Sequence, residues 1–294
     1  MTPTNRYGGK SAPRHAIVYL SHIHNKKIWR AYKKLESECA AFADVHFALN
    51  LSSDDLLPDT KNVVPITPAH RAALRHPRRA NSKGGDKAFL AFRQNIPEYD
   101  YYWMVEYDVA FSGDWSRLFK AFADNKSDLL CTNVHRRETN PKWAWWNSLE
   151  WPDNSKPELI RGFFAIARLS AQALDAIIVA GQKGFDGHYE IMWPTVLHHS
   201  GFSIEDIGGD GPFVRPANVN RWYTSTPTSE ILSPGTLVYR PAHFRPGRTP
   251  NKLWHPVKHS FVEYVKGTRT YSRISSRITR VLSSFELSKT DGTA

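Results

Sequence analysis

Cysteine is scarce in this chain of 294 residues, which has only Cys39 and Cys131. Two cysteines so far apart in sequence exclude a disulfide framework and a zinc knuckle. A reducing compartment therefore fits the chain best. The sequence also lacks an apolar run of the roughly 20 residues that a membrane-spanning helix needs. Its first residues lack the apolar stretch of a signal peptide. We therefore expect a cytoplasmic protein, with peripheral contact to the inner membrane face as a further expectation.

Acidic residues are outnumbered, with 28 Asp and Glu against 39 Lys and Arg, which gives a formal net charge of +11. The excess is concentrated near the C-terminus. From Arg248 to Ala294, nine Lys or Arg oppose three acids, a net charge of +6. This asymmetry indicates an anionic partner surface, either lipid or nucleic acid.

The C-terminal segment 263–294 has the pattern of a basic amphipathic helix. Apolar residues fall at helical spacing beside arginines: Ile274, Ile278, Val281, Leu282 and Phe285 with Arg273, Arg277 and Arg280. Such a helix either lies on an anionic membrane surface or packs on its own domain. Residues 1–13 are expected to form a flexible tail, which leaves one domain over residues 14–262.

Hydrophobic residues make up 41% of the chain, enough to bury a core. Apolar runs rich in β-forming residues alternate with segments of helical spacing, which predicts an open α/β sheet flanked by helices. Strands are expected at 15–21, 44–49, 62–66, 101–105, 128–134, 162–167 and 236–240. Helices are expected at 26–43, 87–95, 115–123 and 171–179, the last with Ser170 as its N-cap and Gly181 at its end.

Two carboxylates follow the strongest of these strands, Tyr101-Tyr102-Trp103-Met104-Val105. Its continuous apolar run is typical of a central strand covered on both faces. Glu106 and Asp108 come directly after it, where open α/β sheets bind ligands. Residues two apart on an extended chain point to the same side, so this pair could share Mn²⁺ or Mg²⁺. The alternative is a pair of surface acids at the start of the next helix.

The segment Tyr102-Trp103-Met104-Val105-Glu106-Tyr107-Asp108 resembles the D-x-D motif of GT-A glycosyltransferases, as an E-x-D variant. The resemblance covers about residues 15–245 and implies a GT-A, Rossmann-like fold in a single domain. It also implies a Leloir-type, metal-dependent enzyme that takes its sugar from a nucleotide-diphosphate sugar. Three further features of the sequence support it.

First, a glycine-containing loop and a basic helix start lie upstream of the acids, as in the class. The resemblance implies donor-binding roles here, with Tyr107 grouped among them: Lys83, Gly84, Gly85 and Lys87. An ordinary loop before a helix is the alternative interpretation.

Second, Gly187-His188-Tyr189-Glu190 resembles the acidic motif at the start of a later helix in the class. Glu190 takes the place of the acid that faces the acceptor, with Asp186 as the alternative base, and Pro194 would lie in the first helical turn. A helix-capping glutamate is the competing interpretation. Third, the class often completes its metal site with a late histidine, for which His243 is the first candidate and His255 the second.

Aromatic residues crowd the loop over residues 141–151. Trp143, Trp145 and Trp146 could stack on a sugar ring of a saccharide or lipid-linked acceptor, and Arg161 could hold a phosphate or an acidic sugar. Local packing of indole rings is the alternative. The expected function is sugar transfer in polysaccharide biosynthesis. The competing hypotheses are a basic nucleic-acid-binding protein, although no nucleic-acid signature is present, and a carbohydrate-binding GT-A pseudoenzyme.

Overall fold

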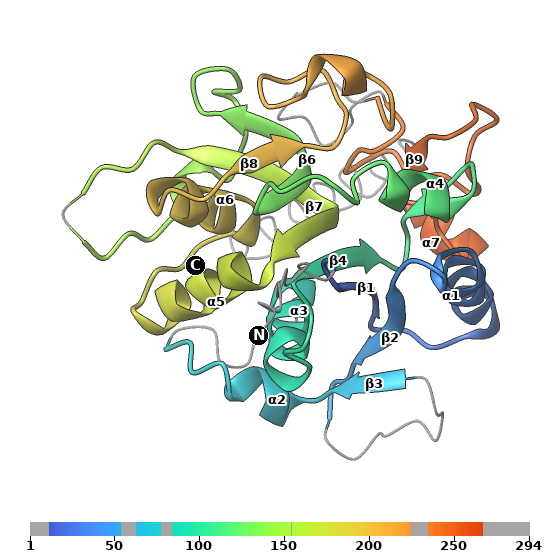
Figure 1. The fold of residues 1–294 in the computed structure, drawn as a ribbon, viewed down its shortest axis with the longest axis horizontal. Coiled ribbons are helices and arrows are strands. Elements are labelled where there is room, and N and C mark those ends of the chain that lie inside the picture. Colours follow the sequence, from blue (N-terminus) through green and yellow to red (C-terminus); the bar gives the residue numbers. More distant parts are fainter. Residues whose placement is uncertain (1–11, 54–62, 78–83, 154, 225–234, 267–294) are drawn as a thin grey trace, which may run out of the picture.

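The computed structural model describes residues 12–53, 63–77, 84–153, 155–224 and 235–266. Its centre is a seven-stranded sheet in the order β3-β2-β1-β4-β7-β6-β8 (Figure 1). These strands are β1 His15–Ser21, β2 Asp44–Asn50, β3 Val63–Ile66, β4 Tyr101–Glu106, β6 Leu129–Arg136, β7 Ile160–Ser170 and β8 Ile204–Asp206.

The sheet is mixed. Strands β3, β2, β1 and β4 are parallel neighbours, β7 runs antiparallel between β4 and β6, and β8 is parallel to β6. This confirms the predicted single α/β domain with an open mixed sheet, an architecture consistent with a GT-A arrangement. The strands predicted up to residue 167 all form, and none of their ends is more than three residues from the expected position.

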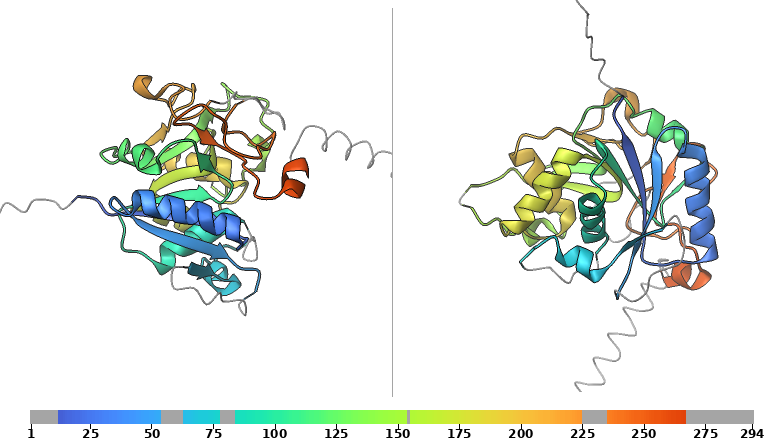
Figure 2. Two further views of the ribbon diagram at one scale, coloured as in Figure 1. Left: turned by 90° about the vertical axis from the view of Figure 1, so that its right-hand side faces the viewer. Right: turned by 60° about the horizontal axis from the view of Figure 1, so that its bottom comes forward.

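Helices cover both faces of the sheet (Figure 1). α1 and α4 pack on one face and α3, α5 and α6 on the other, with α2 against α3. Their bounds are α1 Lys26–Cys39, α2 Pro68–Ala72, α3 Gly85–Asn95, α4 Trp115–Lys120, α5 Ala171–Gln182 and α6 Tyr189–His199. A short helix, α7 Phe261–Lys266, ends the described chain and projects from the domain (Figure 2).

The alternation of side chains along the central strands builds two cores. On β4, Tyr102 and Met104 join the core beneath α3 and α5, whereas Trp103 and Val105 join the core beneath α1 and α4. All four side chains are buried, as expected for a central strand with both faces covered. A strand held in this way fixes the position of the residues that follow it.

Side-chain caps define several helix starts. Asn25 accepts hydrogen bonds from the backbone N–H groups of Lys27 and Ile28, and Ser170 accepts one from Ala173 as predicted. α5 runs one residue past Gly181. The expectation for Pro194 is wrong, since it lies inside α6 rather than in its first turn. Pro194 has no N–H to donate to the carbonyl oxygen of Glu190 four residues earlier.

A second, two-stranded sheet joins the middle of the chain to its C-terminal part. β5 Ala110–Phe111 pairs antiparallel with β9 Leu253–Trp254, with Ala110 opposite Trp254. The strand predicted at 236–240 does not form. Leu237 makes only an isolated bridge with His255, and Tyr239 is 61% exposed.

Some expectations fall outside the described residues. These are residues 1–11 of the N-terminal tail, and the C-terminal segment from residue 267, including the apolar stripe of its predicted helix. Among the helices that the structure describes, none has the length and apolar character to cross a bilayer.

Candidate metal and active site

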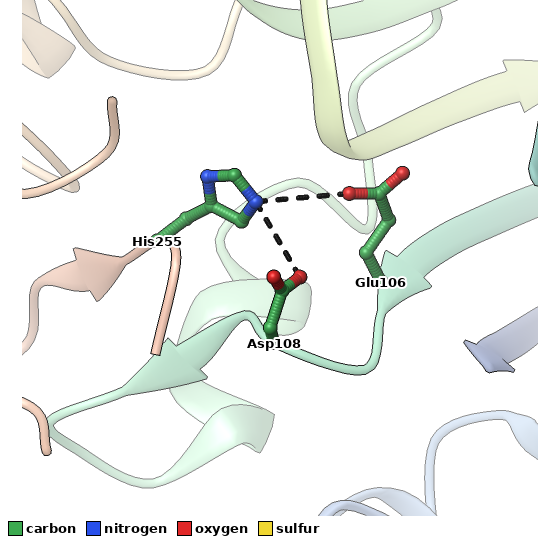
Figure 3. Close-up of side chains that lie close together, drawn as sticks. All are labelled: Glu106, Asp108 and His255. Carbon is green, nitrogen blue, oxygen red and sulfur yellow. Dashed lines mark ion pairs between the residues drawn. The ribbon is translucent and has the colours of Figure 1, made fainter. Parts of the chain in front are cut away.

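Three side chains converge beyond the carboxyl end of β4: Glu106, Asp108 and His255 (Figure 3). One ligand atom from each lies within 4.8 Å of the others. Nε2 of His255 is 3.4 Å from Oδ1 of Asp108 and 3.7 Å from Oε2 of Glu106. These separations are close to the ~3 Å between neighbouring ligands of an octahedral ion with bonds of about 2.1 Å.

Strand pairing brings His255 to the acids. Asp108 lies in the turn between β4 and β5, and β9 pairs with β5, so the residues after β9 run back alongside this turn. The backbone N–H of Val257 donates to the carbonyl oxygen of Asp108 at 2.7 Å. The small sheet thus carries the histidine across to a carboxylate from a distant part of the chain.

The imidazole of His255 is oriented by a backbone contact. Its Nδ1 lies 2.8 Å from the carbonyl oxygen of Val238. A carbonyl oxygen can only accept, so Nδ1 carries the proton in this hydrogen bond. Nε2 is then the atom that faces the two carboxylates, and in the neutral ring it offers a lone pair. A metal-binding histidine typically has its second nitrogen held in this way.

His255, the second candidate in sequence, is the histidine that lies against the two acids. His243, the first candidate, lies nearby with its ring 5.2 Å from and nearly perpendicular to that of Trp254. Its Nε2 is buried without a hydrogen-bond partner, and burial followed by the charge of His255 lowers its pKa. Within the described chain, the group of possible metal ligands contains His255 and not His243.

Lys258 is part of the site and was not expected from sequence. Its Nζ donates to Oδ2 of Asp108 at 2.6 Å, while Oδ1 of the same carboxylate faces His255. The next residue, His259, contacts the carbonyl oxygen of Tyr107 at 2.7 Å, and the hydroxyl of Tyr19 donates to the same oxygen. The only sequence signal for Lys258 is its position three residues after His255.

The two carboxylates have opposite pKa shifts. Burial, followed by the charge of Asp108, raises the pKa of Glu106 to about 7. Burial alone would also raise the pKa of Asp108, but the cationic His255 and Lys258 outweigh it and lower that pKa. The pair therefore combines an acid whose ionised form is favoured by its neighbours with one that ionises near neutrality. Such an arrangement favours a cation between them.

Glu190 lies in the first turn of α6 and belongs to the same electrostatic environment. Burial raises its pKa to about 7, against the opposing charges of Arg161 and His255. Its own charge contributes to the raised pKa of Glu106. Nδ1 of His188, the residue at the N-cap of α6, lies 3.8 Å from Oε2 of Glu190. A carboxylate with a pKa near neutrality can act as a general base.

Asp186, the alternative base, has a different environment. Its backbone pairs with Glu150, and its Oδ1 accepts a hydrogen bond from the N–H of Gly187. Burial and the charge of Lys87 lower the pKa of His76, and the charge of Asp186 partly opposes this shift. Glu190 is among the charges that shift the pKa of Glu106 most, and Asp186 is not among them. Of the two candidates, Glu190 therefore has the stronger electrostatic link to the metal-site carboxylates.

The tryptophan loop divides into buried and exposed members. Trp143 and Trp146 are buried in a small core with Ile191 of α6, and the indole N–H of Trp146 donates to the carbonyl oxygen of Asn140. Trp145 is 50% exposed, and its ring stacks on that of His188 at 4.8 Å. Trp143 and Trp146 thus support α6. Trp145 has an exposed face beside His188, which lies two residues before Glu190.

Arg161 extends from β7 beneath the same loop. Its guanidinium lies 4.6 Å from the centre of the Trp143 ring, and its buried Nε has no hydrogen-bond partner. Burial lowers its pKa, and the charge of Glu190 opposes that effect. Arg161 is therefore a buried cation within electrostatic reach of the candidate base.

The glycine loop upstream contributes the start of α3. Gly84 is the N-cap, and a Cβ on Gly85 would lie 3.7 Å from Oε1 of Glu106, so this backbone runs beside the carboxylate. Lys87 is buried, and its Nζ contacts Nδ1 of His76. Lys83 lies outside the described residues. The structure thus places the start of α3 next to the site, with Lys87 in contact with His76.

A scan of protein-family models and a search of curated proteins find no match to this chain. Among solved structures, similar chains are glycosyltransferases. Mouse xyloside xylosyltransferase 1 in its apo form has 12% identity and a TM-score of 0.37, over 67% of this chain and 85% of its own. The galactosyltransferase LgtC, in complex with donor and acceptor sugar analogues, has 12% identity and a TM-score of 0.38, over 65% and 73%.

A third similar structure is a Drosophila galactosyltransferase 7 mutant in complex with manganese, UDP-Gal and xylobiose. It has 10% identity and a TM-score of 0.33, over 66% of this chain and 64% of its own. These structural neighbours are GT-A glycosyltransferases, the class that the sequence resembles.

Proposed function

We propose that this protein is a metal-dependent glycosyltransferase that moves a sugar from a nucleotide-diphosphate sugar to a saccharide or lipid-linked acceptor. The observation that carries the proposal is the convergence of Glu106, Asp108 and His255 at the carboxyl end of a central strand. Ligands of open α/β sheets bind at this edge.

The donor set fits Mn²⁺ or Mg²⁺. Two carboxylate oxygens and one imidazole nitrogen leave further coordination positions for water and phosphate oxygens. Such an ion, when bound, neutralises the negative charge that develops on a leaving diphosphate. Lys258, held by Asp108, adds a second positive charge on the same side of the site.

Glu190 is the proposed general base. In a transfer that inverts the anomeric centre, its carboxylate would accept the proton of the acceptor hydroxyl as that oxygen attacks the sugar. The exposed face of Trp145 and the cation of Arg161 are the proposed acceptor contacts. The backbone at Gly84 and Gly85, with Tyr107 and the lysines of that loop, would line the donor side.

Cellular role and location remain part of this proposal. Transfer to a saccharide or lipid-linked acceptor suits a cytoplasmic enzyme of polysaccharide biosynthesis. The rival hypothesis of a nucleic-acid-binding protein has only the net charge in its favour, since the sequence carries no recognition-helix, zinc or RNA-binding signature. A pseudoenzyme with the same fold would bind the donor and transfer nothing.

The test combines a thermal-shift screen with an assay of donor hydrolysis and sugar transfer. Nucleoside diphosphates and nucleotide sugars are added with and without Mn²⁺, and wild type is compared with Asp108→Asn. We expect a nucleotide to raise Tm in a Mn²⁺-dependent manner, and the variant to lose both this shift and turnover. A fully active Asp108→Asn protein would rule out the metal role. Donor binding without hydrolysis or transfer would identify a pseudoenzyme.

A further inference from the structure

Exposed apolar side chains gather at the C-terminal end of the described chain. The rings of Phe244, Phe261 and Tyr264 contact one another, with centroids 5.5 to 6.4 Å apart. Phe261 is 67% exposed and Phe244 is 50% exposed. On α7, Val262 and Val265 are exposed beside them. We call these five residues the aromatic patch.

Four of the five patch residues lie on α7, which projects from the domain (Figure 2), and Phe244 packs against Phe261 and Tyr264 from an earlier loop. Most of the other large apolar side chains of the described residues are buried in the cores. A contiguous exposed apolar cluster typically marks a surface that binds a partner. The identity of that partner follows from the charges around it.

Basic residues surround the patch in sequence. Arg245 and Arg248 are exposed in the loop that follows Phe244, and α7 leads into residues 267–294, which contain five arginines or lysines and two acids. Aromatic rings combined with basic side chains match the interface of an anionic bilayer, where the rings enter the headgroup region and the cations meet lipid phosphates.

We propose that the aromatic patch docks this protein on an anionic membrane surface. The contacts of the preceding segment connect the patch to the candidate active site. Lys258 holds Asp108 and His259 contacts the backbone of Tyr107, and α7 begins two residues later. Docking at α7 therefore brings the metal site close to the bilayer, where a lipid-linked acceptor would be found. The binding itself does not depend on the proposed sugar transfer.

The test is co-sedimentation of the full-length protein with vesicles of phosphatidylcholine, with and without phosphatidylglycerol. We expect binding to the anionic vesicles, weakened by added NaCl because the charges are solvent-exposed. Phe261→Ser and Phe244→Ser should each lower the partition coefficient at least about tenfold, since each removes a large buried apolar surface from the bound state. Turnover of a soluble acceptor should be unchanged in both variants.

Val179→Ser and Val219→Ser are matched controls, because both valines are exposed outside the patch. Their partition coefficients should equal that of wild type. Absence of binding to anionic vesicles, or wild-type binding by Phe261→Ser, overturns the proposal. Two other outcomes also overturn it. If residues 267–294 cover the patch, Phe261→Ser lowers Tm without any vesicle binding in wild type. If a second copy covers it, wild type is a dimer that Phe261→Ser dissociates.

Discussion

Nε2 of His255 lies 3.4 Å from Oδ1 of Asp108, and the ring is held there by its Nδ1 contact with Val238. Asp108 comes from the middle of the chain and His255 from its C-terminal part. They meet because β9 pairs with β5 directly after the acidic turn. The proposed metal site therefore depends on the pairing of two distant strands. Substitutions of the acids and of His255 can each test it.

Removal of the imidazole should weaken metal binding. Substitutions that only reorient a metal ligand typically cost 10- to 100-fold in affinity, so we expect His255→Ala to lower Mn²⁺ affinity by at least about 100-fold. Isothermal titration calorimetry measures this directly. His243→Ala is the matched control, since His243 is a neighbouring partly buried histidine outside the ligand group. Equal losses in the two variants would contradict the assignment of His255.

Metal stabilisation should depend on pH. Glu106 has a pKa of about 7, so at pH 6 it is mostly protonated, and a proton competes with the cation. The pKa of His255 is also raised, because the charges of Asp108 and Glu106 outweigh burial, so its Nε2 also carries a proton at low pH. The Tm increase caused by Mn²⁺ should therefore grow from pH 6 to pH 8. A constant increase measured by scanning calorimetry would argue against these ligands.

Without metal, the same carboxyl groups make the protein less stable as the pH rises. The folded-state pKa values of Glu106 and Glu190 are raised to about 7 from an ordinary value of 4.5. At these two carboxyl groups the folded protein thus binds more protons than the unfolded chain between these values, so their contribution to the free energy of unfolding falls as pH rises from about 4.5 to 7. Denaturant unfolding of wild type and Glu190→Gln at several pH values in a chelator isolates the Glu190 part. The difference in the free energy of unfolding between the two proteins should change with pH over this range.

Loss of the candidate base should lower turnover and leave metal binding intact. Glu190→Gln is expected to reduce kcat by about 100- to 10,000-fold, the usual contribution of general base catalysis. Because the base must be ionised, wild-type kcat/KM at saturating Mn²⁺ should rise with pH through about 7, and the variant should lack this limb. Asp186→Asn is the control, expected to retain both turnover and the limb. The reverse result would make Asp186 the base.

The sequence predicted the sheet and the acidic pair because their signals are local. The apolar run Tyr101–Val105 identifies a central strand, and the two acids come one and three residues after it. The hydroxyl of Ser170 similarly sits directly before its helix. In these cases secondary structure alone decides where the side chain lies.

Local signals could not identify which histidine is the metal ligand or which tryptophan is exposed. His255 reaches the site through strands of only two residues, too short to leave a periodic pattern, while the longer apolar run at 236–240 forms no strand. Trp143, Trp145 and Trp146 have similar local sequence surroundings, and only their packing against Ile191 or His188 separates the buried rings from the exposed one. Contacts between distant segments decide both cases.

Lys258 should have separate effects on stability and on catalysis. Removal of one partner from a buried ion pair costs about 3–5 kcal/mol, and both side chains of the Lys258–Asp108 pair are largely buried, so Lys258→Ala should be destabilising by a few kcal/mol in metal-free protein. Mn²⁺ should bind the variant at least as tightly, because a competing cation is gone, while kcat falls. Lys258→Arg keeps the charge and should restore part of the lost stability and part of the lost kcat. Tighter Mn²⁺ binding with unchanged kcat would leave Lys258 a purely structural role.

Two neighbouring tryptophans should respond in opposite ways to the same substitution. Trp146 is 3% exposed, so Trp146→Ala creates a cavity and should lower the free energy of unfolding by about 3–5 kcal/mol. Trp145 is half exposed, so Trp145→Ala should change stability by less than about 1 kcal/mol. If its free face stacks on the acceptor, the variant raises KM for the acceptor about tenfold and leaves KM for the donor unchanged. Denaturant unfolding and initial-rate kinetics with each substrate varied in turn separate these effects. An unchanged acceptor KM in Trp145→Ala would remove this indole from the acceptor site, and the buried pair Trp143 and Trp146 would then be left as supports for α6.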